Sequence, residues 1–476
     1  MDLVIKNGKV VSLGGIVSAA IGVHRGKIVD IAAETSLPSA DTTIDTTDRY
    51  ILPGVCDMHC HEDFSGSEEG GYAPWTKIAR TEPQAAVLGG VTTMGFYLMP
   101  PGDKSLADVF ESYRQPWESN SVVDGIFHIM AVSEQRLDEM ERDCSEFGIT
   151  DFKFLIGYKG AQAAAQGLAG IDDGFIVDGL RRVVKLREKG WPALALIHAE
   201  NPDVMPLLRK EASKRYDVRA WHDSRPNFVE EECVRRIIFW AGVTKCPILI
   251  VHTTIREAVD YAAKVQAEGV EIGEEVIIET CPQYLTHHHD NLTPLQNKKP
   301  VFTVVNPPIR TKEDNEKLWQ GIKDGLVTVI GADLAPSTMK SKDVDMWKAP
   351  FVPMGLANTS THILPVLLSE GVHKRGLSLE KVVEISSYNP ARYYSVYPQK
   401  GTISVGSDAD MAIVDMNKEV TWKASMAPSN ADWSIYEGWK FKGWPVMTIL
   451  RGKVAMEDGK ILAEPGYGKY IPRKKK

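Results

Sequence analysis

Cysteine is scarce in this sequence, and it is not arranged as a zinc finger or a disulfide framework requires. The six cysteines are scattered along 476 residues without a Cys-x-x-Cys pair, so we expect reduced thiols. The chain also lacks an apolar run of the roughly 18 residues that a membrane span needs, and Met1 to Lys6 show no signal-peptide pattern. These absences predict a cytoplasmic protein with no membrane partner.

Positive charge is limited as well. The formal net charge is -8, and no region has the excess of lysine and arginine that phosphate contacts need, which argues against a nucleic-acid partner. The only basic run, Arg473 to Lys476, is expected to be a solvated tail. With 43% hydrophobic and 25% charged residues, the composition is that of a globular protein with one large and one smaller domain.

Apolar runs of strand length alternate with segments of helical period through most of the chain. Helices are expected at residues 175–189, 228–243, 255–269 and 312–325. Strands are expected at residues 50–57, 91–98, 125–131, 151–155, 193–198, 247–252, 275–280 and 327–333. Strands separated by helical crossovers form parallel sheets, and this number of them predicts an α/β fold with a (β/α)₈ TIM-type barrel.

Both ends of the chain contain short strand-like runs without a helical segment. We expect these runs at residues 3–5, 20–23 and 27–31, and again at 401–404, 410–414, 445–450 and 453–456. The two ends should combine into a small β-sandwich domain of residues 1–51 and 395–476, with the catalytic barrel at 52–394.

The most informative motif is His59-Cys60-His61, at the end of the first predicted barrel strand. Residues two apart on a strand project to the same face, so both imidazoles can hold one metal ion, while Cys60 should face the other side. Taken alone, the pair is as consistent with ordinary polar residues at a strand end.

Further polar residues follow other predicted barrel strands. Lys153 lies on the fourth, and His198, His252 and Asp333 end the fifth, sixth and eighth. Singly, each histidine could be a core residue and Asp333 a helix cap. Because the carboxyl ends of barrel strands converge on one mouth, where active sites of this fold lie, their joint occurrence predicts a metal centre.

Two cations at the usual spacing of about 3.5–4 Å need an anion between them. Lys153 is the candidate, because a neutral lysine amine can add carbon dioxide to form an anionic carbamate, and burial beside cations favours the neutral amine. The spacing of the residues alone leaves this modification open.

These motifs resemble the amidohydrolase superfamily, most closely the hydantoinases, dihydropyrimidinases and allantoinases. Besides the residues above, the resemblance includes residues 198–201, 279–285, 307–310, 331–333, 401–410 and 465–468. It implies two divalent metal ions per chain, Zn2+ first and Mn2+, Ni2+ or Co2+ as alternatives. It also implies N6-carboxylysine at Lys153 as a bridge, with His59, His61 and Asp333 on one ion and His198 and His252 on the other.

The resemblance further implies the catalytic roles. A hydroxide between the ions would attack the amide carbonyl, and Asp333 would pass its proton to the leaving nitrogen. Tyr158 matches the phenol that hydrogen-bonds the oxyanion in the family; otherwise it is a barrel-rim aromatic residue.

The substrate pocket departs from the family pattern. Asp63 replaces the arginine of dihydroorotases, which disfavours a carboxylated ring. Asn306 replaces a serine and Met354 an asparagine that contact the cyclic ureide. Because a thioether lacks the donor and acceptor of an amide, ring recognition must differ, or Asn358 must replace the missing asparagine.

Two aromatic residues after the first and second strands, Phe64 and Phe96, are expected to line the pocket and to suit an apolar ring substituent. The alternative is a hydrophobic rim used in oligomer packing. Residues 465–473 resemble family tails that pack on neighbouring subunits, which implies a homo-oligomer, either a dimer or a homotetramer.

The sequence therefore predicts a binuclear metal hydrolase that opens a small-molecule cyclic amide or ureide ring, of the hydantoinase or dihydropyrimidinase type. An allantoinase-like or cyclic-imide hydrolase is the nearest alternative. From another class, a non-catalytic scaffold like the collapsin-response mediators would keep the fold, but such scaffolds lose metal ligands that this chain retains.

Overall fold

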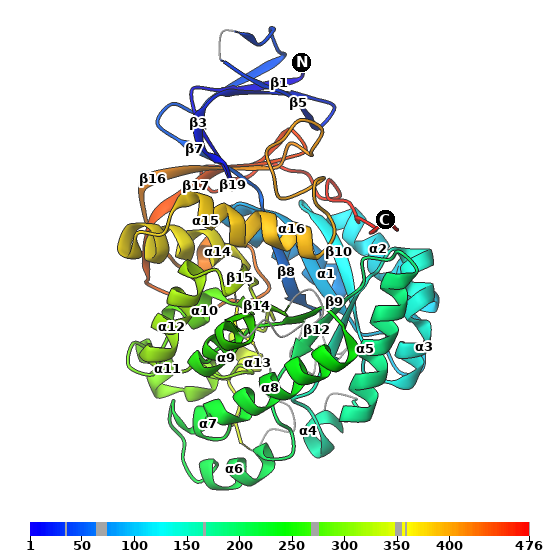
Figure 1. Cartoon of the computed structure of the whole chain (residues 1–476). Coiled ribbons are helices and arrows are strands. Elements are labelled where there is room, and N and C mark those ends of the chain that lie inside the picture. The colour runs from blue at the N-terminus through cyan, green and yellow to red at the C-terminus, as the bar shows by residue number, and fades with distance from the viewer. Residues whose placement is uncertain are drawn as a thin grey trace.

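The computed structural model consists of a barrel ringed by helices and a β-rich region at one side of it (Figure 1). It describes residues 1–33, 36–62, 74–164, 168–267, 276–347, 355–357 and 359–475, except for the side chains of residues 161 and 162. All six cysteines are buried and free, as expected.

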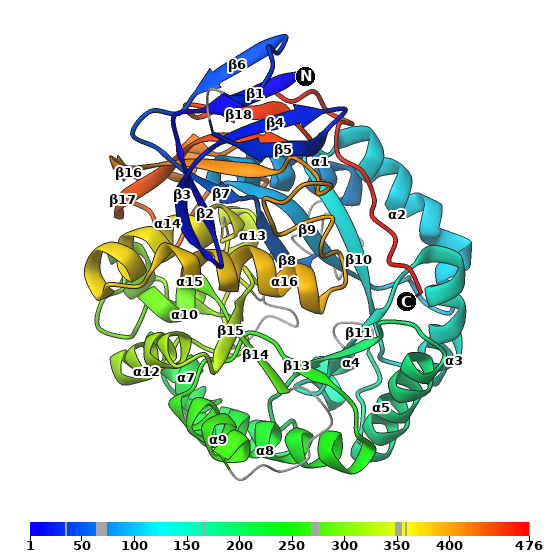
Figure 2. The ribbon, with the colours of Figure 1, turned by 45° about the horizontal axis from the view of Figure 1, so that its top comes forward.

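Eight parallel strands form the barrel (Figure 2). In chain order they are β8 (Val55–His61), β9 (Val91–Leu98), β10 (Asp124–Met130), β11 (Asp151–Leu155), β12 (Leu194–His198), β13 (Ile248–Ile250), β14 (Val276–Thr280) and β15 (Val327–Ile330). Leu334, just after β15, closes the ring: its amide donates to the His59 carbonyl at 3.2 Å, and its carbonyl accepts from the His61 amide at 2.8 Å. The predicted (β/α)₈ barrel is confirmed.

The first barrel strand begins later than its sequence pattern indicated. Residues 50–53 belong to another strand, β7 (Tyr50–Pro53), and β8 starts after Gly54. The chain passes so close to Thr92 at this point that a Cβ on Gly54 would lie 2.1 Å from the Thr92 hydroxyl oxygen. The single apolar run is therefore two strands of two different sheets.

Helices surround the barrel and connect its strands. They are α1 (Trp75–Ala86), α2 (Leu106–Asn120), α3 (Glu134–Arg142), α4 (Gly160–Ala164), α5 (Asp173–Glu188), α6 (Met205–Ala212), α7 (Ala220–Asp223), α8 (Asn227–Thr244), α9 (Arg256–Ala267), α10 (Pro282–Thr286), α11 (Pro294–Lys298), α12 (Lys312–Lys323), α13 (Met339–Lys342), α14 (Ile363–Val366), α15 (Leu379–Val383) and α16 (Asn389–Tyr393). The four helices expected from periodicity are α5, α8, α9 and α12. Among the described helices, none is long and apolar enough to cross a membrane.

Two further sheets are built from the ends of the chain. A four-stranded sheet has the order β5 (Lys27–Ala32), β4 (Ala20–His24), β1 (Leu3–Lys6) and β6 (Thr42–Asp45). A seven-stranded sheet has the order β19 (Lys460–Ile461), β18 (Lys453–Glu457), β17 (Lys440–Leu450), β16 (Met411–Thr421), β7, β2 (Lys9–Ser12) and β3 (Gly15–Ser18). Leu3 and Ile21 of the first sheet share one core with Met411 and Ile449 of the second. The exact domain limits stay a prediction.

A buried ionic cluster fastens this β-rich region to the barrel. The Lys400 ammonium lies 2.5 Å from Asp124 of β10, 3.0 Å from Asp408 and 2.6 Å from Asp410. Lys400 is 1% exposed. Burial would lower the pKa of this lysine, but the three carboxylates raise it overall. The three aspartates also have the spacing of a cation site, and Lys400 supplies the positive charge there.

The segment near Arg473 is a correction to the sequence analysis, which expected a solvated tail. It runs past α2 (Figure 2), and Arg473 is buried, with 3% exposure. Its guanidinium donates to the Asp151 carboxylate at 3.0 Å, and the Ile471 amide donates to the Gly125 carbonyl at 2.8 Å. The buried Asp151 needs a cationic partner, and the amino ends of β10 and β11 therefore hold this segment.

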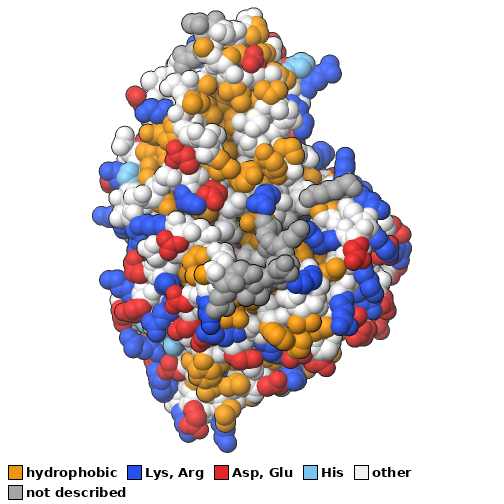
Figure 3. Space-filling model, viewed as in Figure 1, with side chains coloured by type: hydrophobic (Ala, Val, Ile, Leu, Met, Phe, Trp, Pro, Cys, Tyr) orange, Lys and Arg blue, Asp and Glu red, His pale blue; other side chains and the backbone are white. Residues whose placement is uncertain are grey.

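One face of the surface carries lysine and arginine interspersed with aspartate and glutamate over the barrel helices (Figure 3). Charges of both signs are mixed on this face. Hydrophobic side chains gather over the β-rich region in the same view.

Candidate metal centre

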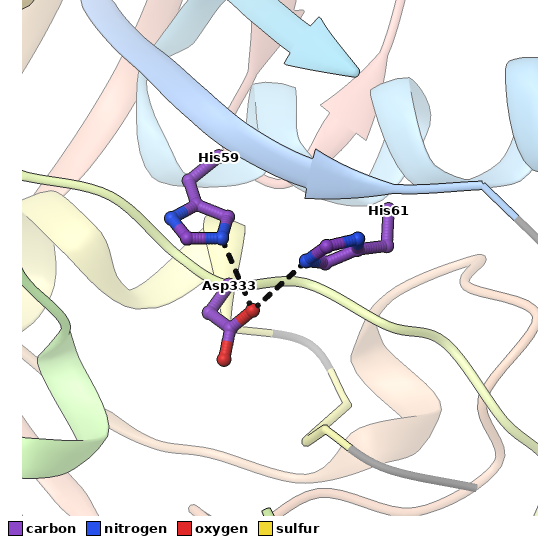
Figure 4. A group of neighbouring side chains, drawn as sticks. All are labelled: His59, His61 and Asp333. Carbon is purple, nitrogen blue, oxygen red and sulfur yellow. Dashed lines mark ion pairs between the residues drawn. The ribbon is translucent and has the colours of Figure 1, made fainter. Parts of the chain in front are cut away.

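Three of the predicted ligands meet at the mouth of the barrel. His59 and His61 of β8 both point toward Asp333, which follows β15 (Figure 4). The Nε2 atoms of His59 and His61 lie 3.3 and 3.2 Å from the same carboxylate oxygen of Asp333. Cys60, between them, faces the opposite side of the strand, in the apolar core outside the barrel. Its thiol donates to the Asp57 carboxylate. The alternation of the strand therefore places both imidazoles on one side, as expected.

The other two predicted histidines lie beside this group. Nδ1 of His198 is 2.9 Å from Nε2 of His252, and the His252 and His59 ring centroids are 5.3 Å apart. His252 and Asp333 have φ angles of +40° and +51°. Left-handed backbone is uncommon for residues other than glycine, and it clusters at functional sites.

Lys153 completes the set from β11. It is fully buried, and its amine makes no hydrogen bond with any described residue. The amine lies 4.5 Å from the centroid of the Tyr97 ring. Burial lowers the pKa of Lys153 to about 8, although Asp333 and Glu279 oppose the shift. A buried amine that is partly neutral and has no hydrogen bond with a described residue is suited to carbamate formation.

The protonation states of Asp333 and His252 also suit metal binding. Burial would raise the pKa of Asp333, but hydrogen bonds from His59 and His61 hold it well below its usual range. Burial lowers the pKa of His252 well below its usual value, with help from His198 and Lys153. Ionised carboxylate and neutral imidazole are the forms that coordinate a cation. These nitrogen and oxygen donors fit divalent transition metals.

Comparison with known proteins identifies the family. The model of the amidohydrolase family matches residues 250–455. The D-hydantoinase of Ralstonia pickettii is 32% identical over 485 residues, which cover 100% of this chain and 99% of that protein. The chain belongs to the amidohydrolase family.

The similarity of this amidohydrolase extends to the cyclic amidohydrolase group and to the fold. The L-hydantoinase of Paenarthrobacter aurescens is 29% identical, with 99% of this chain and 98% of that protein covered. The crystal structure of dihydropyrimidinase from Brevibacillus agri NCHU1002 superposes with a TM-score of 0.88 at 28% identity and covers 100% of this chain and 99% of that one.

Two glutamates of this amidohydrolase hold the histidines in place, and the sequence analysis missed both. Glu279 of β14 accepts from Nδ1 of His59 at 2.6 Å and from the His252 amide at 3.1 Å. Glu200 lies 2.9 Å from Nε2 of His198 and accepts from Arg225 at 2.9 Å. Carboxylates of this kind fix the tautomer and the direction of a ligating imidazole. Their positions at or just after predicted strand ends were the available signal.

Replacing Glu279 by glutamine should lower the metal affinity of this amidohydrolase about 10 to 100-fold. The amide keeps the shape of the side chain but loses the charge that orients His59 and makes its ring more basic. Competition with a chromophoric chelator measures the affinity. The control is Glu211→Gln, whose side chain is 69% exposed. Equal affinity in both variants would contradict the role of Glu279.

Tyr158 and Asn306 lie together at the edge of this centre. The Asn306 carboxamide nitrogen donates to the Tyr158 hydroxyl at 3.0 Å, and the Tyr158 ring is 5.5 Å from that of His198. Burial raises the pKa of Tyr158 to about 12, so the phenol keeps its proton near neutral pH. A Cβ on the preceding residue, Gly157, would lie 2.5 Å from His198, so this turn requires a glycine.

The remaining pocket predictions have different outcomes. Phe64 and Met354, together with Asp63 and Asn358, lie outside the described residues and stay predictions. The prediction that Phe96 lines the pocket is wrong.

Phe96 is fully buried outside the barrel, 5.1 Å from the Trp75 ring and 5.4 Å from the Trp117 ring. Neighbouring residues of β9 face opposite sides, so Tyr97 points inward instead. The Tyr97 ring lies 4.9 Å from that of His59.

Proposed function

We propose that this amidohydrolase is a binuclear metal hydrolase that opens a cyclic amide or ureide ring, of the hydantoinase or dihydropyrimidinase type. The observation that carries the proposal is the buried Lys153 amine, which has no hydrogen bond with a described residue and lies among four histidines and Asp333. Full-length similarity to named hydantoinases supports the reaction class.

In the proposed centre, His59, His61 and Asp333 would hold one divalent ion and His198 and His252 the other. N6-carboxylated Lys153 would bridge them. Zn2+ suits these donors, with Mn2+, Ni2+ or Co2+ as alternatives. The ions would supply an activated water and polarise the substrate carbonyl.

Two side chains would then move or hold protons during ring opening. Asp333 would accept the proton of the attacking water and deliver it to the leaving nitrogen. Tyr158 would donate its phenolic hydrogen to the oxygen that becomes negatively charged. Because the pKa of Tyr158 is raised to about 12, the phenol would act as a donor over the whole neutral range.

A turnover panel of hydantoin, 5-phenylhydantoin, dihydrouracil, allantoin and cyclic imides tests the proposal. We expect ring opening of hydantoins and weak turnover of dihydrouracil, because Met354 replaces the asparagine that recognises the ureide in the family. The reaction is followed by the loss of ring absorbance. Efficient hydrolysis of dihydrouracil would show that Met354 matters little, and turnover of allantoin or imides alone would favour the alternative enzymes.

Metal content separates the enzyme from a non-catalytic scaffold. The chain retains all six proposed ligand positions, and the five imidazole and carboxylate side chains are buried together. Freshly purified protein should therefore contain close to two divalent ions per chain, the stoichiometry of a two-metal site. Fewer than about one ion per chain would contradict the enzymatic role.

We also propose that the protein assembles with copies of itself. A homo-oligomer, dimer or tetramer, is supported by the outermost strand of the seven-stranded sheet, β3, where Ile16 and Val17 are 40% and 54% exposed. The cytoplasmic location stays a prediction from the sequence.

A further inference from the structure

Asn306 lies on a segment that is held rigidly from three sides. The buried amine of Lys342 donates to the Val304 carbonyl at 2.7 Å. The indole nitrogen of Trp221 donates to the Val305 carbonyl at 3.1 Å, and the Tyr284 hydroxyl donates to the Pro307 carbonyl at 2.7 Å. These donors come from α13, α7 and α10. The backbone on both sides of Asn306 is therefore fixed, and this fixes the point from which its side chain extends.

That side chain makes one directed contact. The carboxamide nitrogen donates to the Tyr158 hydroxyl oxygen at 3.0 Å, and the carboxamide oxygen has no hydrogen bond with any described residue. Asn306 and Tyr158 are only 5% and 6% exposed. A tyrosine hydroxyl has a single hydrogen, and a lone pair occupied by an incoming N–H leaves that hydrogen to point elsewhere.

We propose that Asn306 is a positioning residue that turns the Tyr158 hydroxyl hydrogen away from itself and toward the substrate carbonyl. This inference rests on the proposed function, in which Tyr158 donates to the oxyanion. Donors that are oriented before the reaction need no reorganisation during it. A serine at this position would lack the carboxamide nitrogen, so the contact depends on the asparagine.

The variant Asn306→Asp tests the direction of the hydrogen bond. A carboxylate only accepts, so it would draw the Tyr158 hydrogen toward residue 306 and away from the substrate. We expect kcat to fall about 100-fold, the usual loss when one oxyanion donor is removed, with a much smaller change in KM. Asn306→Ser is the matched control: it leaves the hydroxyl free to rotate, so kcat should fall less than about 10-fold.

A double-mutant cycle with Tyr158→Phe separates this effect from a structural or charge effect. If Asn306 acts through the hydroxyl, Asn306→Asp should change kcat by less than about 3-fold once that hydroxyl is absent. All four proteins are compared as metal-loaded holoenzymes, with metal content measured, on the best substrate of the wild-type protein.

Three results would overturn the inference. These are a kcat of Asn306→Asp near the wild-type value, equal losses in Asn306→Asp and Asn306→Ser, or an undiminished loss in the Tyr158→Phe background. The last result is the one expected from a new carboxylate that disturbs the metals. Absence of any cyclic-amide turnover by the wild-type protein would instead contradict the proposed function, so the two failures are distinguishable.

Discussion

Lys153→Ala should yield a folded protein that has lost both metal ions and all measurable ring-opening activity. The five imidazole and carboxylate side chains of the centre lie together, but two cations at about 3.5–4 Å repel each other without an anion between them. Alanine removes the amine that would carry this anion as a carbamate. Metal analysis and turnover of the purified variant measure the two losses, and circular dichroism reports whether the barrel is intact.

The rate at which activity returns should depend on carbon dioxide, which provides a second test of the role of Lys153. Metal-stripped wild-type protein should regain activity slowly in buffer depleted of carbon dioxide and quickly after bicarbonate is added, because the carbamate forms from the neutral Lys153 amine. Lys189→Ala is the control, since that lysine is exposed and pairs with Glu141 on the surface. A metal-loaded, active Lys153→Ala protein would refute the bridging role.

Lys400→Met should strongly lower the free energy of unfolding. Methionine resembles lysine in length but leaves Asp410 buried without its cation. Asp124 and Asp408 lose the same ammonium and keep only Arg451 and Lys27, respectively. Removing one partner of a buried ionic cluster costs about 3–5 kcal/mol. Urea unfolding of the two proteins, followed by tryptophan fluorescence near neutral pH, measures the difference in the free energy of unfolding.

The sign of the pH dependence tests the cause of that loss. Burial already raises the pKa of Asp410 to about 6, although Lys400 opposes the shift. Without Lys400, the folded-state pKa of Asp410 should rise further above its unfolded value. The folded variant then binds more protons than the unfolded chain, so its stability increases as the pH falls from about 8 to about 5.

A surface lysine provides the comparison for Lys400→Met. Lys418 pairs with Asp458, whose side chain is 71% exposed, and such pairs contribute about 0–1 kcal/mol. Lys418→Met should therefore change the free energy of unfolding by less than about 0.5 kcal/mol at any pH. An equally small loss for Lys400→Met would mean that the cluster contributes little to stability. A large loss that does not shrink at low pH would mean that unpaired buried carboxylates are not its cause.

The sequence predicted those features that a periodic pattern or a strand end makes visible. Eight apolar runs predicted the barrel, and the alternation around Cys60 placed His59 and His61 on one face. These signals are local, because they depend on residues a few positions apart. The proposed ligands were predicted from their places on or at the ends of expected strands, because the strand ends of a barrel converge on its mouth.

The features that the sequence could not reveal depend on contacts between distant residues. Strand β9 is buried on both faces along its whole length, so its apolar run does not show that Tyr97 rather than Phe96 faces inward. The break at Gly54 depends on Thr92, and the burial of Arg473 depends on Asp151. Glu279 supports His59 from 220 residues away along the chain. None of these partners lies within the window that a local pattern covers.

The position of Arg473 also has a consequence for the order of assembly. Its guanidinium meets Asp151, 322 residues earlier in the chain, so β10 and β11 are synthesised long before the segment that completes their amino ends. The barrel can acquire its full set of contacts only after residue 473 has left the ribosome. Until then Asp151 has His128, 3.1 Å away, but lacks its buried cation, and the nascent barrel should depend on chaperones that shelter unfinished sheets.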